Sequence, residues 1–96
     1  MKNYWVYILK CSDGSYYTGV TNDLERRVFQ HKAGSGGSYT KSRRPVKLVF
    51  CEVFGNILDA IAAEKQIKGW RRSKKEALIA GDWDKIVELS NMRKNK

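Results

Sequence analysis

Cysteine, proline and histidine are scarce in this sequence. Its 96 residues include two cysteines, one proline and one histidine. Cys11 and Cys51 show neither CxxC nor Cys/His spacing, so we expect reduced core thiols, with a disulfide or a metal site as the alternatives. No apolar run approaches the roughly 20 residues that cross a membrane, and the first residues lead into a strand without the pattern of a signal peptide. These absences predict a cytoplasmic protein.

Acidic side chains are outnumbered by basic ones. Ten Asp and Glu residues stand against nineteen Lys and Arg residues, which gives a formal net charge of +9. A positive field of this size on a small chain favours a polyanionic partner, either nucleic acid or an anionic membrane surface. The sequence has no amphipathic helix with a broad Trp/Leu face to support the second alternative. We therefore expect nucleic acid as the partner and no membrane.

The hydrophobic pattern predicts one domain over residues 1–96, with its core over about 4–80. Two strands, a helix, a third strand and two helices (ββαβαα), followed by a short C-terminal helix, indicate an α+β or α/β fold. The expected strands span residues 4–10, 16–20 and 46–54, and a mobile glycine-rich loop spans 33–42. The expected helices begin at caps Asn22, Asn56 and Ser73 and end near 32, 68–70 and 81, and a last helix over 82–90 precedes a frayed basic tail over 91–96.

The first two strands carry two tyrosines whose relative placement depends on the turn between them. A two-residue turn at Asp13-Gly14 would place Tyr7 and Tyr17 on opposite faces of the sheet. A three-residue loop over 12–14, with Gly14 left-handed, would place both on one face. We predict the second arrangement, or a bulge of equal effect.

An acid interrupts the apolar stripe of the helix expected after residue 56. At 100° per residue, Glu64 lies between apolar neighbours that include Ala60 and Ile67. A carboxylate in that position is costly unless it is paired or bound to a metal. A structural ion pair with Lys68, one turn on, is the alternative.

The first expected helix and the loop after it carry residues that suit the binding of an anion. Arg27 and His31 are four residues apart and share one face of the first expected helix. The following loop interleaves cations with an aromatic residue, a pattern that suits a nucleic-acid backbone and an exposed base. A merely solvated loop is the alternative for that segment. Its candidate substrate-binding residues are Tyr39, Lys41, Arg43 and Arg44.

These stretches together resemble a known family. The sequence VYI at residues 6–8 and YTG at 17–19 resemble the two motifs of the GIY-YIG nuclease domain. The pattern NDLxxRVxxH at 22–31 resembles that family's helix with its arginine. The stretches YTKxRRP at 39–45 and EKQIKGW at 64–70 resemble the small stand-alone branch known as YhbQ-like or UPF0213 proteins.

The resemblance implies an α+β fold with a three-stranded antiparallel sheet flanked by helices, and metal-dependent cleavage of phosphodiester bonds. By position, Glu64 would bind one Mg²⁺ or Mn²⁺, and Tyr17 or Tyr7 would activate the attacking water. Arg27 would hold the scissile phosphate, with His31 close to it. One carboxylate suits a hard cation that keeps several waters, and a guanidinium fork suits a phosphate that gains charge.

The sequence thus predicts an endonuclease that acts on DNA, with RNA as the alternative substrate, in DNA repair or in the processing of branched or damaged strands. A non-catalytic nucleic-acid-binding module with the same fold is the main alternative. An adaptor that depends on a partner protein for specificity is the other. The type of substrate and the choice between Tyr7 and Tyr17 as general base stay open at this stage.

Overall fold

A three-stranded antiparallel sheet forms the centre of the computed structural model, which describes residues 2–94. Its strands are β1 (Tyr4–Lys10), β2 (Tyr16–Thr21) and β3 (Lys47–Phe54), in the spatial order β2-β1-β3. Both pairings are antiparallel, which confirms the predicted α+β fold. β1 is the central strand and buries side chains on both faces, as its unbroken apolar sequence predicts.

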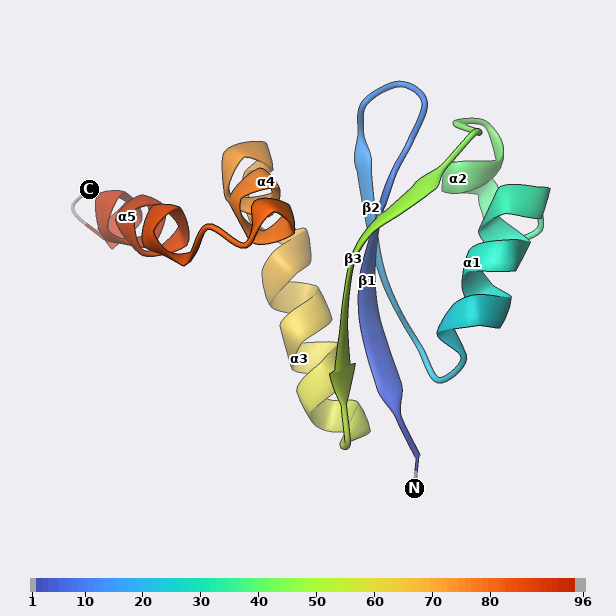
Figure 1. Ribbon diagram of the computed structural model, residues 1–96, viewed down its shortest axis with the longest axis horizontal. Helices are drawn as coiled ribbons and strands as arrows, with labels where there is room; N and C mark the ends of the chain where they lie inside the picture. The colour runs from blue at the N-terminus through green and yellow to red at the C-terminus, as the bar shows by residue number, and fades with distance from the viewer. Residues whose placement is uncertain (1, 95–96) are drawn as a thin grey trace.

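Helices cover both faces of the sheet, as Figure 1 shows. On one side lie α1 (Leu24–Ala33) and the short α2 (Ser38–Lys41). On the other lie α3 (Ile57–Lys68), then α4 (Arg72–Ala80) and α5 (Trp83–Lys94). None of these described helices is long and apolar enough to cross a membrane.

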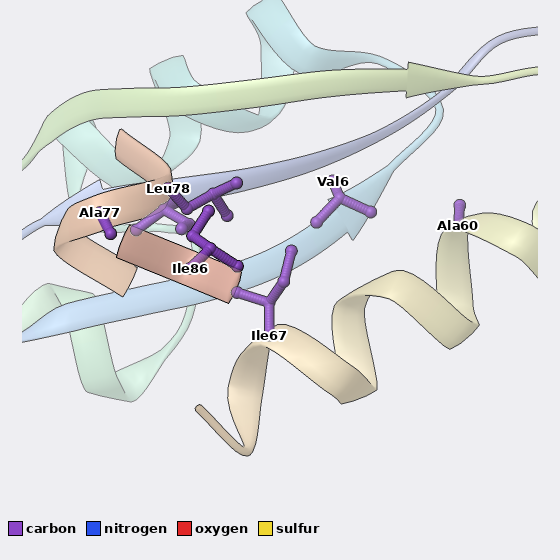
Figure 2. Close-up of a cluster of buried hydrophobic side chains, with 7 residues drawn as sticks. Val6, Ala60, Ile67, Ala77, Leu78 and Ile86 are labelled. Atoms are coloured by element: carbon purple, nitrogen blue, oxygen red, sulfur yellow. The ribbon is translucent and has the colours of Figure 1, made fainter. Parts of the chain in front are cut away.

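Alternation along β1 divides the core into two clusters. Val6 and Ile8 point toward α3, α4 and α5, and Figure 2 shows Ala60 and Ile67 of α3 directed at this side of the sheet. Tyr7 and Leu9 point the other way and pack with α1. Because successive side chains of a strand face opposite sides, the two clusters are separated by the sheet itself. The second cluster includes Tyr7 and Tyr17, the two tyrosines singled out in the sequence.

Two helix caps differ from the predicted ones. Asp23, not Asn22, caps α1, because its carboxylate accepts a hydrogen bond from Arg26 N at 3.1 Å. β2 continues to Thr21, whose side-chain oxygen accepts from Asp23 N, so the cap moves one residue along. The predicted cap Ser73 is wrong as well. The N-cap of α4 is Arg71, two residues earlier, and its side chain makes no hydrogen bond to the helix.

Three other expectations need correction. The predicted mobile loop contains α2, whose Thr40 is buried. Helix α5 continues to Lys94, so residues 91–94 are helical rather than a frayed tail, and residues 95–96 lie outside the described part. Both cysteines are free, but only Cys11 is buried as expected. Cys51 is exposed, because it lies on the edge strand β3.

Candidate active site

The β1–β2 hairpin brings both predicted tyrosines to one face of the sheet. Cys11 N donates to Ser15 O at 2.8 Å, which closes a three-residue loop with Gly14 at φ 85°. In the resulting register, Tyr17 lies opposite Leu9 and on the same face as Tyr7. The ring centroids of Tyr7 and Tyr17 are 6.4 Å apart. The predicted turn and its consequence for the two phenols are therefore confirmed.

A glycine opposite Tyr7 provides the space that its ring occupies. Gly19 pairs with Tyr7 across the two strands. A Cβ at this glycine would lie 2.5 Å from Tyr7 Oη and 2.6 Å from Cζ. Any larger residue would displace the ring, so the glycine of the YTG stretch sets where the phenol lies.

We expect Gly19→Ala to destabilise the fold by about 1–3 kcal/mol, the usual cost of overpacking a core. Gly55→Ala is the matched control, because a Cβ at that position meets no atom within 4 Å. Urea denaturation followed by circular dichroism would measure both. Equal midpoints for the two variants would contradict the proposed close contact between Gly19 and the Tyr7 ring.

His31 is fully buried and connects three elements of the structure. Its Nε2 lies 2.9 Å from Tyr7 Oη, and its Nδ1 lies 2.8 Å from Thr40 Oγ1. Either Tyr7 donates to Nε2 and Nδ1 donates to Thr40, or both directions are reversed. Both arrangements leave the imidazole neutral. Burial first, and the charge of Arg27 second, lower the pKa of His31 below its ordinary value. Thr40 was not predicted, because a threonine in a glycine-rich segment carries no pattern that marks it.

The lowered pKa of His31 predicts a pH dependence of stability. Below a pH of about 6.5, the unfolded chain binds a proton that the folded state disfavours, so the free energy of unfolding decreases. Neutral His31 therefore contributes to the free energy of unfolding, and this contribution is fully present above a pH of about 6.5, which is the pKa in the unfolded chain. As the pH falls toward the pKa in the folded protein, the contribution is lost at a rate of at most about 1.4 kcal/mol per pH unit. Denaturation of the wild type and of His31→Gln between pH 7.5 and 5.5 would measure it. Identical slopes for the two proteins would contradict it.

Arg27 extends from α1 toward the same cluster. Its Nη2 donates to Gly36 O at 2.8 Å, and its Nη1 donates to Gln30 Oε1 at 3.2 Å. These bonds hold a half-buried guanidinium close enough to Tyr7 to oppose the rise in that phenol's pKa. Burial is the largest cause of that rise, and the charges of Tyr17 and Glu64 add to it. Arg27 therefore acts electrostatically on both Tyr7 and His31, and it lies four residues before His31 on the same helix.

Glu64 lies on α3 with its side chain only 14% exposed. It forms an ion pair with Lys68, with 3.2 Å between Oε2 and Nζ, which is the alternative weighed from the sequence. Its negative charge nevertheless raises the pKa of the Tyr7 phenol, which belongs to the other cluster. The charge of Glu64 therefore adds to the field at Tyr7, although its own helix packs on the opposite face of the sheet.

The donor set around Glu64 fits one particular kind of metal ion. Within residues 2–94, no three His, Cys, Asp or Glu side chains are grouped so that they could hold a metal ion together. A lone carboxylate suits a hard cation such as Mg²⁺ or Mn²⁺ that keeps most of its waters, and does not suit zinc. A divalent ion on Glu64 would reverse the sign of the charge that acts on Tyr7. Lys68 would have to give up its contact with the carboxylate.

The predicted substrate-binding segment lies beside the tyrosines only in part. The Tyr39 ring is 5.8 Å from that of Tyr17, and the Arg43 guanidinium carbon lies 3.9 Å above the Tyr39 ring. Arg43 also forms an ion pair with Asp13 of the hairpin loop at 3.1 Å. Lys41 and Arg44 are exposed and belong to the same segment. Arg44 donates to Lys41 O at 3.1 Å and lies against the end of α1.

Comparisons with known proteins agree with this geometry. The family model described as "GIY-YIG catalytic domain" matches residues 3–77. A UPF0213 protein of Bacillus pumilus is 46% identical over 77 residues, which cover 80% of this chain and 79% of that protein. The UPF0213 protein YazA of Bacillus subtilis is 48% identical over 77 residues, which cover 80% and 78% of the two chains.

Two structures solved by solution NMR are also similar. A UPF0213 protein from Bacillus halodurans has a TM-score of 0.55 and 41% identity, with 92% of this chain and 97% of that chain covered. A protein from E. faecalis has a TM-score of 0.59 and 35% identity, with 84% and 86% covered. The resemblance predicted from the motifs is confirmed, and this chain belongs to the GIY-YIG catalytic-domain family, in its UPF0213 branch.

Proposed function

We propose that this protein is a metal-dependent endonuclease that hydrolyses phosphodiester bonds of DNA, and that it acts in DNA repair or in the processing of branched or damaged strands. The observation that supports this most is the meeting of distant residues around one phenol. Tyr7 contacts His31 and lies beside Tyr17, and burial raises its pKa while Arg27 opposes that rise. We propose that residues 1–96 act as one domain with its core over about 4–80.

The two tyrosines differ in a way that suggests separate roles. Tyr7 is buried and its pKa is raised, so it stays protonated. With His31 Nε2–H donating to its oxygen, its own hydroxyl hydrogen would be available to donate to phosphate. Tyr17 is less buried and borders the exposed Tyr39. In the proposed reaction, Tyr17 is the general base that takes a proton from water, and the water oxygen attacks phosphorus as the bond to the leaving oxygen breaks.

The other residues bind and orient the phosphate. The Arg27 fork would contact two phosphate oxygens, which gain charge in the transition state. Mg²⁺ or Mn²⁺ held by Glu64 would polarise the phosphate and stabilise the leaving oxygen. Four residues of the 39–44 segment would hold the flanking backbone and a base: the exposed Tyr39, Lys41 and Arg44, and the half-buried Arg43.

Cleavage assays test this proposal. Labelled duplex, branched and single-stranded DNA would be incubated with wild type in Mg²⁺, in Mn²⁺ and in chelator, and we expect cutting only with metal. Tyr17→Phe should lower the rate by about a hundredfold or more, the usual contribution of a general base. Tyr16→Phe is the matched control, because its hydroxyl contacts Glu76 and its ring packs in the cluster on the opposite face. Equal rates for Tyr17→Phe and wild type would contradict the role of Tyr17.

A non-catalytic binding module is the second candidate function. One observation favours it: the charged groups of the site already have partners within the protein. Lys68 contacts Glu64, and Gly36 O and Gln30 contact Arg27. In that case the same assays would show binding that weakens steeply with salt and no cutting under any condition. An adaptor would cut only after a partner protein is added.

A further inference from the structure

A second cationic surface lies outside the site described above. The end of α3 and the start of α4 carry six of the nineteen basic residues within residues 65–75, and no acidic residue interrupts them. This stretch is called the α3–α4 corner below. Its basic residues are Lys65, Lys68, Arg71, Arg72, Lys74 and Lys75.

Helix stability explains only part of this concentration of charge. The first turn of α4 contains no acidic residue, although the helix dipole favours acids there and disfavours cations. Lys65 and Lys68 lie in the last turn of α3, where the helix dipole favours cations. Arg72 of α4 is paired with Glu76 at 3.4 Å. Lys74 and Lys75 in the first turn of α4 have neither source of stabilisation, which favours an external anionic partner for the charge at the start of this helix.

The corner is joined to the predicted substrate-binding segment through the tip of the β1–β2 hairpin. From one side, Arg72 Nη1 donates to Gly14 O at 2.6 Å, and its guanidinium lies 4.8 Å from the centre of the Tyr16 ring. From the other side, Arg43 pairs with Asp13 at 3.1 Å. Figure 1 shows the hairpin tip at the top of the view, with α4 on one side of it and α2 on the other.

The charged surface also begins at the proposed catalytic carboxylate. Lys68 contacts Glu64, and Lys74 lies over the ring of Trp70, with 4.3 Å from Nζ to the ring centre. Trp70 lies between α3 and α4 and packs against the core. Cations thus extend from Glu64 along a bend that is anchored to the core by Trp70.

We propose that the α3–α4 corner binds the phosphodiester backbone of nucleic acid beyond the scissile bond. This inference rests on the proposed function, because it assumes that the 39–44 segment and Glu64 face the same substrate. The longest dimension of the molecule is 42 Å. At 3.4 Å per base pair, roughly twelve base pairs cover that length, so a 20-base-pair duplex is long enough to contact both cationic segments, and a much shorter strand offers fewer phosphates to them.

Binding of labelled DNA, measured in the presence of a chelator so that metal-dependent cleavage cannot occur, tests this proposal. A 20-base-pair duplex, a single strand of 20 nucleotides and a single strand of 6 nucleotides would be titrated by fluorescence anisotropy at several salt concentrations. For Arg71→Gln/Lys74→Gln we expect about tenfold weaker binding of the long probes and a salt slope smaller by about one to two. The effect on the 6-nucleotide strand should be less than about twofold. The duplex and single-strand arms show which form of backbone the corner prefers.

Lys2→Gln/Lys85→Gln is the matched control, because it removes the same charge from two exposed positions outside both cationic segments. Equal loss of affinity in the two double variants, or no loss in the first, would overturn the proposal. Thermal unfolding would verify that each variant is folded, and Lys65→Gln/Arg71→Gln would replace the first if it is not. If wild type cuts DNA but the corner variant binds normally, only this inference fails. If the corner effect appears without any cutting, only the proposed cleavage fails.

Discussion

Glu64→Gln should reduce the rate of metal-dependent cleavage by about a thousandfold or more, because the several kcal/mol that a metal ion contributes to a phosphoryl transition state correspond to that factor. The substitution keeps the size of the side chain and removes the charge that a divalent ion needs. The fold should survive, since the lost ion pair with Lys68 joins a carboxylate to an ammonium that is 52% exposed. Such a pair contributes up to about 1 kcal/mol.

Glu88→Gln is the control for this effect. It removes the same charge from α5 and also breaks a helical ion pair, there with Lys85. We expect its cleavage rate to stay within about threefold of wild type, as for a surface change away from the reacting groups. Cleavage by Glu64→Gln at the wild-type rate would show that the acid is structural and that the ion, if one is used, binds elsewhere.

Arg27→Lys should lower the cleavage rate by about a hundredfold while leaving the net charge unchanged, because an ammonium cannot replace a guanidinium fork on two phosphate oxygens. A smaller loss of stability should accompany it, since the bond from Nη2 to Gly36 O is removed. Cleavage rates under saturating substrate, together with urea midpoints, would separate the two effects.

The neighbouring arginine provides the comparison. Arg26 is exposed on the same helix, one residue before Arg27. Arg26→Lys should therefore leave the rate within about threefold of wild type. If both substitutions lower the rate equally, the first helix contributes only general positive charge, and the proposed contact of Arg27 with the scissile phosphate is wrong.

Much of this arrangement was predictable, because short-range rules determine it. Loop length and a left-handed glycine set the hairpin register, which places Tyr7 and Tyr17 on one face. Helical periodicity placed Glu64 on the inner side of α3, where its side chain is 14% exposed. Both inferences depend only on residues close together in sequence.

The remainder depended on contacts that no local pattern encodes. Thr40 is recognised as a site residue only from the structure, in which its hydroxyl contacts His31 and places α2 beside the site. The exposure of Cys51 follows from the position of β3 at the edge of the sheet, which its apolar sequence did not reveal. Whether Glu64 pairs with Lys68 or holds a metal ion is a competition between partners, which sequence spacing alone cannot decide.

The proposed mechanism requires a divalent ion on Glu64 close to both phenols, and NMR with Mn²⁺ tests that directly. The ion is paramagnetic, so small amounts broaden the signals of nearby groups whether or not any DNA is cut. In wild type we expect the ring signals of Tyr7 and Tyr17 to broaden first, while those of Trp83 on α5 stay sharp. In Glu64→Gln the tyrosine signals should stay sharp as well. Unchanged tyrosine signals in wild type, or equal broadening in the variant, would contradict a metal site at this acid.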